Sequence, residues 1–114
     1  MASEHKQNLL ELIKPKNLIK INEHPRDLQA MIIEPCYYNN GMAKENKCPD
    51  LFLEYVNGLW SIIELKHTTR SRNKARIQIE SGYEFLHDVF NIKYDDMTGK
   101  LVTYEGGFKY ERIR

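Results

Sequence analysis

Two carboxylates and one ammonium group stand at the outer ends of two consecutive apolar segments of this chain. Pro49-Asp50 opens the first segment, and Glu64-Leu65-Lys66 closes the second, 14 positions after Asp50. If the two segments pair as an antiparallel hairpin, their outer ends meet and bring these side chains together. Two neighbouring carboxylates supply the oxygen ligands that a hard divalent cation such as Mg²⁺ prefers. A lysine beside such an ion can face a phosphate group or a water molecule.

The elements that must position these groups are two strands joined by a short turn. Residues 51–56 and 59–65 are rich in Leu, Ile, Phe, Tyr, Val and Trp, and Asn57-Gly58 lies between them. Asn-Gly between two apolar runs is a strong sequence signal for a hairpin. These two segments are therefore the strands that the sequence predicts most clearly.

The length of the hairpin loop decides whether the two carboxylates meet. A two-residue turn would leave the side chain of Asp50 facing away from Glu64. A three-residue loop, with Gly58 in the left-handed conformation, would pair Tyr55 with Leu59 and place Asp50 across from Glu64 on one face of the sheet. A shared metal ion favours the three-residue loop, or a distortion at the start of the first strand with the same effect.

The rest of the chain predicts helices packed on this sheet. Ser3 is a suitable N-cap for a helix to about residue 14, which Pro15 stops. A second helix is expected over 71–90, weakened at Gly82 by roughly 1 kcal/mol relative to Ala. Its expected apolar stripe is Ile77, Ser81, Phe85, Leu86 and Val89. Further predictions are a short helix at 28–30 capped by Asp27, a strand at 31–34 that could extend to 38, and a loop at 39–47. Strands are also expected at 92–94, 101–104 and 108–113, with a turn at 97–99. The order α, β, β, β, α, β, β predicts an α/β (α+β) fold with a mixed sheet.

The composition is that of an ordinary globular domain. With 114 residues, 41% hydrophobic and 29% charged, the chain predicts a single domain over residues 1–114. No apolar run approaches the length needed to span a bilayer and no signal peptide is recognised, so we expect a cytoplasmic protein without a membrane partner. Cys36 and Cys48 are separated by 11 residues, which matches neither a zinc site nor a disulfide framework.

The stretch from residue 66 to residue 76 is basic, although the net charge of the chain is only +1. A basic stripe beside a metal site is the pattern expected of phosphate contacts, while the solvated start of a helix would have the same composition. The five cations of this stretch are Lys66, Arg70, Arg72, Lys74 and Arg76.

Pro49-Asp50 followed by Glu64-Leu65-Lys66 resembles the signature of the PD-(D/E)xK nuclease superfamily. Members of that superfamily place Pro-Asp at the start of one strand and Glu-x-Lys near the end of the next, and a helix follows. Many of them carry a glutamine in that helix, as this chain does at Gln78. The match covers about residues 48–90, and the size resembles that of archaeal-type Holliday junction resolvases and of small viral or phage nucleases. The resemblance implies a restriction-endonuclease-like sheet flanked by helices.

The resemblance also implies roles for individual residues. Asp50 and Glu64 would hold one or two Mg²⁺ ions together with the main-chain carbonyl of Leu65. Lys66 would position or activate the attacking water, or stabilise charge on the scissile phosphate. Gln78 would orient Lys66, the water or the substrate.

Other residues complete the implied site. An acid on the first helix often assists the metal in this superfamily; Glu11 is the expected one here, and Glu4 is the alternative. The cations Arg70, Arg72, Lys74 and Arg76 would grip the nucleic-acid backbone. His67 would contact substrate, or would be an ordinary histidine at the end of a strand.

The sequence thus predicts an endonuclease that hydrolyses DNA phosphodiester bonds with Mg²⁺ or Mn²⁺, with branched or junction DNA among its candidate substrates. A homodimer is expected, since a chain this short offers little surface for grasping a duplex. Two alternatives stay open. The chain could be a non-catalytic nucleic-acid-binding or interaction module of the same fold, or a viral ribonuclease.

Overall fold

A five-stranded mixed sheet forms the centre of the computed structural model, which describes residues 3–39, 42–43 and 48–114. The strand order is β1-β4-β5-β6-β7, with β5 and β6 parallel and the other neighbours antiparallel. The strands are β1 (Leu28–Ile33), β4 (Leu51–Tyr55), β5 (Trp60–Lys66), β6 (Met97–Thr103) and β7 (Lys109–Arg112). A separate two-stranded ribbon consists of β2 (Tyr38–Asn39) and β3 (Met42–Ala43). The predicted α+β class with a mixed sheet is confirmed.

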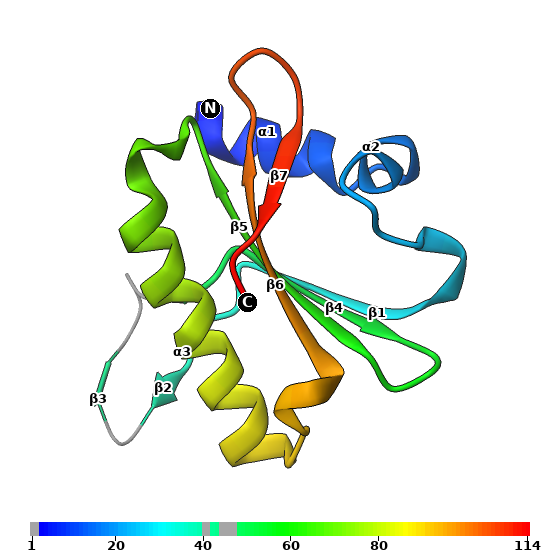
Figure 1. Ribbon diagram of the computed structural model, residues 1–114, viewed down its shortest axis with the longest axis vertical. Coiled ribbons are helices and arrows are strands. Elements are labelled where there is room, and N and C mark those ends of the chain that lie inside the picture. The colour runs from blue at the N-terminus through cyan, green and yellow to red at the C-terminus, as the bar shows by residue number, and fades with distance from the viewer. Residues whose placement is uncertain (1–2, 40–41, 44–47) are drawn as a thin grey trace.

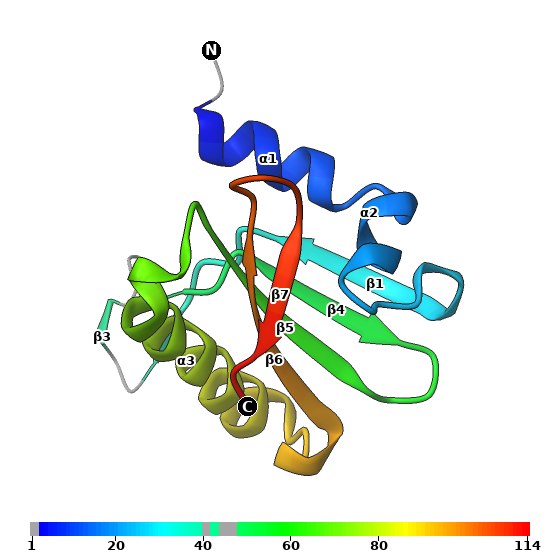
Figure 2. The ribbon, with the colours of Figure 1, turned by 45° about the horizontal axis from the view of Figure 1, so that its top comes forward.

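Helices cover both faces of the sheet (Figures 1 and 2). They are α1 (Glu4–Leu12), α2 (Pro15–Lys20) and α3 (Arg72–Phe90). None of the helices in the described segments is long and apolar enough to cross a membrane.

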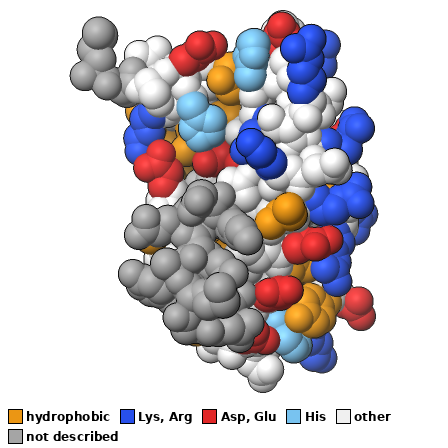
Figure 3. All heavy atoms as spheres, turned by 90° about the vertical axis from the view of Figure 1, so that its left-hand side faces the viewer, with side chains coloured by type: hydrophobic (Ala, Val, Ile, Leu, Met, Phe, Trp, Pro, Cys, Tyr) orange, Lys and Arg blue, Asp and Glu red, His pale blue; other side chains and the backbone are white. Residues whose placement is uncertain are grey.

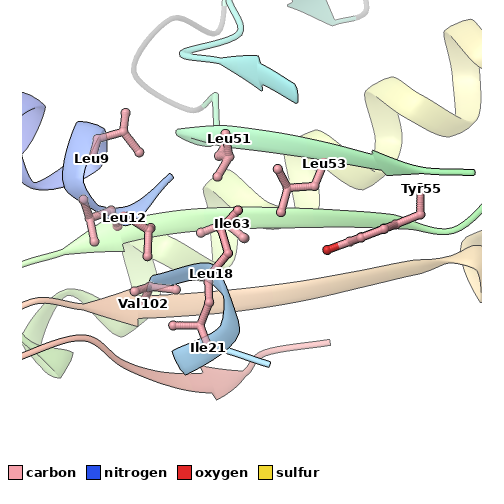
Figure 4. Close-up of a cluster of buried hydrophobic side chains, with 10 residues drawn as sticks. Leu9, Leu12, Leu18, Ile21, Leu51, Leu53, Tyr55, Ile63 and Val102 are labelled. Carbon is pink, nitrogen blue, oxygen red and sulfur yellow. The ribbon is translucent and has the colours of Figure 1, made fainter. Parts of the chain in front are cut away.

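The face covered by α1 and α2 buries one of two apolar clusters (Figure 4). Side chains from the two helices and the turn after α2 meet alternate side chains of the central strands, as the period of two along a strand requires. The cluster contains Leu9, Leu12, Leu18, Ile21, Leu51, Leu53, Tyr55, Ile63, Leu65 and Val102. The intervening residues of β4 and β5 point to the opposite face, toward α3.

Two glycines allow α3 to lie close to that opposite face. A Cβ on Gly82 of α3 would come within 3.0 Å of Ile62 and of Phe52, and a Cβ on Gly99 of β6 would lie 2.4 Å from Ile79 Cγ2. The glycine expected only to weaken the helix therefore permits close packing. The predicted apolar stripe is wrong at two positions, because Ile77 and Val89 are both more than half exposed. The buried residues of α3 are Ala75, Ile79, Gly82, Tyr83 and Leu86.

A buried ion pair fastens the turn after α2 to the sheet. Lys100 of β6 donates from Nζ to Glu23 Oε2 and to the carbonyls of Ile21 and Asn22 at 2.8 and 3.2 Å. The other oxygen of Glu23 accepts hydrogen bonds from Tyr55 and Ser61. Both charged side chains are at least nine-tenths buried, so their mutual pairing is what makes the burial tolerable.

The first helix follows its sequence signals. Ser3 caps it by accepting a hydrogen bond from the N–H of Lys6, and α1 ends at Leu12 because the chain turns ahead of Pro15.

Four local predictions are wrong. Residues 28–30 belong to β1, because pairing with β4 satisfies main-chain groups that a single helical turn would leave unpaired. Residues 92–94 lie outside any strand, and 94–96 form a turn of 3-10 helix. Residues 97–99 begin β6, where Met97 pairs with Trp60 beneath α3. The predicted loop at 39–47 contains β3, and its residues 40–41 and 44–47 lie outside the described residues.

Candidate metal and nucleic-acid site

The β4–β5 hairpin adopts the register of a three-residue loop. Gly58 has φ +87°, and Leu51 pairs with Ile63 as the last pair of the ladder. The N–H of Asp50 donates to the Ile63 carbonyl at 3.1 Å, so Asp50 reaches the end of β5 at the level of Glu64. The left-handed glycine that the sequence suggested thus sets the register that brings the two carboxylates to one end of the hairpin.

The Asp50 carboxylate is held from two directions. Its Oδ2 accepts a 2.8 Å hydrogen bond from the main-chain N–H of Leu65 and lies 3.2 Å from Nε2 of His5 in α1. The same His5 nitrogen lies 3.1 Å from the Leu65 carbonyl oxygen. The side chain of Asp50 retains 14% exposure, so the group is positioned without being sealed from solvent.

Glu64 is almost completely buried beside Asp50. Burial raises its pKa to about 9, and the charge of Asp50 adds to the increase, against the opposing effect of Lys66. Lys66 Nζ lies 3.0 Å from Glu64 Oε2. Within the described part of the chain, the other oxygen, Oε1, is buried without a hydrogen-bond partner. Lys66 is therefore paired with Glu64, while the side chain that contacts Asp50 is His5.

These features fit a divalent cation. A buried carboxylate oxygen without a partner and an elevated pKa mark a place where an added positive charge would relieve the cost of ionising both acids. Asp50, Glu64 and the Leu65 carbonyl are the oxygen donors that would hold the ion. No group of three His, Cys, Asp or Glu side chains suited to a metal occurs among the described residues. The donor set consequently depends on the main-chain carbonyl as well as on side chains.

The side chain of Gln78 contacts the main chain just before Asp50. Its Nε2 donates to the Cys48 carbonyl at 3.3 Å, and its buried Oε1 is without a hydrogen-bond partner among the described residues. The direct contact found for Gln78 is thus with the chain that leads into the site, whereas the sequence suggested contact with Lys66, water or substrate.

Glu11 lies away from the carboxylates. It is exposed and pairs with Lys14 at 2.8 Å, and this pairing lowers its pKa. Six residues along a helix amount to about 9 Å and 240° of rotation, so Glu11 and His5 point in different directions. The residue of α1 that reaches Asp50 is His5, which sequence reasoning missed. The available signal was its spacing from the buried Leu9 and Leu12, at i+4 and i+7.

The predicted basic residues lie on the surface around the start of α3. Arg70, Lys74 and Arg76 are exposed. Arg72 instead forms a two-pronged ion pair with Glu111 of β7, and that contact raises its pKa. Figure 3 shows Lys and Arg side chains along one margin of the face that includes α3, with His and acidic side chains in its upper part.

His67 follows Lys66 and is exposed, with its ring 5.2 Å from that of Tyr104. It therefore packs partly on the β6–β7 loop while remaining accessible to a ligand.

No protein-family model, no curated protein and no solved structure matches this chain.

Proposed function

We propose that the protein is a metal-dependent nuclease that hydrolyses phosphodiester bonds of DNA, with Mg²⁺ or Mn²⁺ as cofactor. The observation that carries the proposal is the pairing of Asp50 with the buried Glu64 beside Lys66. A buried acid of raised pKa, Glu64, beside a second carboxylate costs stability and fits a role in binding a cation. The proposed fold family is the restriction-endonuclease-like one of the PD-(D/E)xK superfamily.

Each residue has a role in this mechanism. A bound divalent ion lowers the pKa of a water ligand and polarises a phosphoryl oxygen. Asp50, Glu64 and the Leu65 carbonyl hold the ion. Lys66, whose side chain is 21% exposed, either orients the attacking water or stabilises negative charge on the scissile phosphate. Gln78 keeps the chain before Asp50 in place through the Cys48 carbonyl.

The substrate contacts proposed for this site come from the adjacent surface. Lys74 and Arg76 are exposed cations in the first turns of α3, and Arg70 is an exposed cation just before that helix. Such side chains bind phosphates without reading the base sequence. His67 is placed to join them. Because one small chain covers little of a duplex, we further propose a homodimer with two sites.

A cleavage assay tests the proposal. The purified chain is incubated with single-stranded, duplex, flap and four-way-junction DNA and with RNA, in the presence of Mn²⁺, Mg²⁺ or EDTA. We expect cleavage with the metals and none with EDTA. Asp50→Asn and Glu64→Gln should lose both metal binding and cleavage, whereas Lys66→Ala should lose cleavage and keep metal binding.

Glu54→Gln is the matched control. Glu54 lies on β4, on the same face as Asp50 but at the far end of the strand, so this variant should cut as the unaltered chain does. A chain that cuts none of these substrates with either metal would overturn the proposed function. Cleavage of RNA alone would instead assign the ribonuclease alternative.

One observation favours the non-catalytic alternative. The described residues hold no group of three metal-binding side chains, and Asp50 is already hydrogen-bonded to Leu65 and His5. A binding module of the same fold would keep its DNA affinity in Asp50→Asn and Lys66→Ala and would cut nothing.

A further inference from the structure

A cavity of about 440 Å³ opens on the face of the sheet that carries α1 and α2, beyond the end of α2. The turn after α2, the β4–β5 loop and the strands β6 and β7 form its walls. It begins at Tyr55, which Figure 4 shows at the opposite end of the apolar cluster from Leu9. Glu64 and Lys66 lie near the other end of β5 and, by the period of two along a strand, on the other face. The cavity is therefore separate from the candidate metal site, and its volume is in the range of small-molecule sites.

The charged groups of the cavity include one cation without a side-chain carboxylate partner. Glu23 is the only acid among the described residues that line the cavity, and its buried carboxylate is paired with Lys100. Arg112 also lines the cavity and is exposed. Its Nε donates to the main-chain oxygen of Arg114 at 3.3 Å, and no side-chain carboxylate of the described residues pairs with it. The two terminal nitrogens of Arg112 are therefore available to an anionic ligand.

Tyr110 and Leu59 give the cavity an apolar surface that solvent still reaches. They are 42% and 44% exposed, and both line the cavity. The ammonium group of Lys100 lies 5.0 Å from the centroid of the Tyr110 ring, a cation–π contact that favours this position of the ring. A flat aromatic group placed on these side chains would bury apolar surface and stack on the ring. The cavity thus combines an anion-binding group with a surface for a planar ring.

We propose that this cavity binds a nucleoside monophosphate, with its base against Tyr110 and its phosphate at Arg112. The planar guanidinium group matches two oxygens of a phosphate, and an aromatic ring accepts any base. Asn57 adds a donor for the base edge, because its Oδ1 already accepts the N–H of Leu59 at 3.1 Å and its NH₂ group is the end that can donate to a ligand. The inference goes beyond the proposed function and does not depend on it, because no residue of the candidate metal site takes part.

Isothermal titration in EDTA tests the proposal. The probes are the four ribonucleoside monophosphates, together with adenosine and inorganic phosphate as the two halves of such a ligand. We expect at least one nucleotide to bind. Adenosine and phosphate should each bind about tenfold more weakly or worse, because each lacks either the charged contact or the stacking contact.

Single substitutions assign the contacts. Arg112→Ala should weaken nucleotide binding by about tenfold or more, as the loss of a hydrogen bond to a charged group does. Tyr110→Ala should weaken it by about tenfold through the loss of stacking. Lys109→Ala is the matched control, because Lys109 is an exposed cation of the same strand on its other face. This control and Lys66→Ala, at the candidate metal site, should leave the nucleotide affinity unchanged.

Nuclear magnetic resonance locates the ligand on the unaltered chain. Trp60 is the only tryptophan of the sequence and lines the cavity, so its indole N–H gives a single signal there. The nucleotide should shift this signal and that of the side-chain amide of Asn57, and it should leave the main-chain amide signal of Lys66 in place. This measurement does not depend on the folding of any variant.

The outcomes separate this inference from the proposed function. An absence of binding by all four nucleotides would overturn the inference, and so would binding of phosphate as tight as that of the nucleotides. Binding that is lost in Lys66→Ala and kept in Arg112→Ala would place the nucleotide at the metal site, which overturns the inference and leaves the proposed function. A chain that binds the nucleotide through Arg112 and cuts no nucleic acid would overturn the proposed function and leave the inference in place.

Discussion

The main-chain N–H of Leu65 donates a 2.8 Å hydrogen bond to the carboxylate of Asp50. This bond joins the end of β5 to the residue that precedes β4, so the position of Asp50 is fixed by main chain rather than by a flexible partner. The carbonyl of the same Leu65 faces His5. One residue of the Glu-x-Lys segment therefore orients a carboxylate with its N–H and offers an oxygen with its carbonyl.

Asp50→Asn should preserve the fold and lower the pKa of Glu64. The amide oxygen of asparagine can still accept the Leu65 N–H, whereas the negative charge that helps to raise the Glu64 pKa is gone. Nuclear magnetic resonance titration of the Glu64 side-chain carboxyl should show a pKa below that of the unaltered chain, where it is about 9. Glu54→Gln is the control and should leave that titration unchanged. An unmoved Glu64 pKa in Asp50→Asn would mean that the two acids do not interact.

The metal-free chain should lose stability as the pH rises from about 5 to 9. Glu64 stays protonated in the folded state up to about pH 9, while its ordinary pKa in an unfolded chain is 4.5. Between these values the folded state binds one proton more, so the free energy of unfolding falls with rising pH, by at most about 1.4 kcal/mol per pH unit. His5 acts in the same direction, because its hydrogen bond to Asp50 raises its pKa above 6.5 and that contribution is lost as the pH passes the raised value.

Urea unfolding in EDTA at pH 5.5, 7 and 8.5 measures this dependence. The fall in the free energy of unfolding with rising pH should be clearly smaller in Glu64→Gln, because the glutamine side chain does not titrate in this range. A free energy of unfolding that is equal at the three pH values in the unaltered chain would contradict the assignment of Glu64 as a protonated buried acid.

The part of the site that the sequence predicted well is the part governed by local rules. Asn57-Gly58 between two apolar runs indicates a hairpin, and only glycine adopts the left-handed conformation of the three-residue loop at little cost. The period of two along a strand then places Glu64 and Lys66 on one face. Those rules need no knowledge of distant parts of the chain.

His5 could not be predicted in this way because its role depends on a contact across 45 positions. The rotation of α1 is set by burial of Leu9 and Leu12, while Leu10 is 45% exposed. With that rotation, His5 faces the hairpin and Glu11 faces solvent. Start and end signals locate a helix along the sequence, but tertiary packing decides which of its faces is buried.

Arg76→Ala should weaken DNA binding more than Arg72→Ala does. Arg76 is exposed at the start of α3, whereas Arg72 is engaged by Glu111 and has less freedom to pair with phosphate. Each phosphate contact contributes about 0.9 to the slope of log affinity against log salt, so Arg76→Ala should reduce that slope by about 0.9 and Arg72→Ala by less. Fluorescence anisotropy with a labelled duplex in EDTA, at several salt concentrations, provides the slopes. Equal losses for the two variants would show that the Glu111 pair opens on binding.

Lys100→Met should destabilise the fold by about 3–5 kcal/mol, the usual cost of leaving one member of a buried ion pair without its partner. The change would remove the donor for two carbonyls and for Glu23, which stays buried near Tyr55 and Ser61. Lys93→Met, at an exposed position, is the matched control and should change stability little. In the double variant with Glu23→Gln, the loss should be smaller than the sum of the two single losses, since the charges are coupled. Additive losses in urea unfolding would contradict the coupling.

Gly99→Ala should destabilise the packing of α3 on the sheet by about 1–3 kcal/mol, the usual cost of inserting a methyl group into a filled core. The added Cβ would lie 2.4 Å from Ile79 Cγ2 and 3.1 Å from the Tyr83 ring, both on the buried face of α3. Ile79 is branched at Cβ and has little rotamer freedom in a helix, so the strand or the helix must move. Shortening Ile79 to alanine removes the offending methyl group, and the double variant Ile79→Ala, Gly99→Ala should therefore lose less free energy of unfolding than the sum of the two single variants. If the loss in the double variant equals the sum of the two single losses, α3 does not pack against Gly99 in solution.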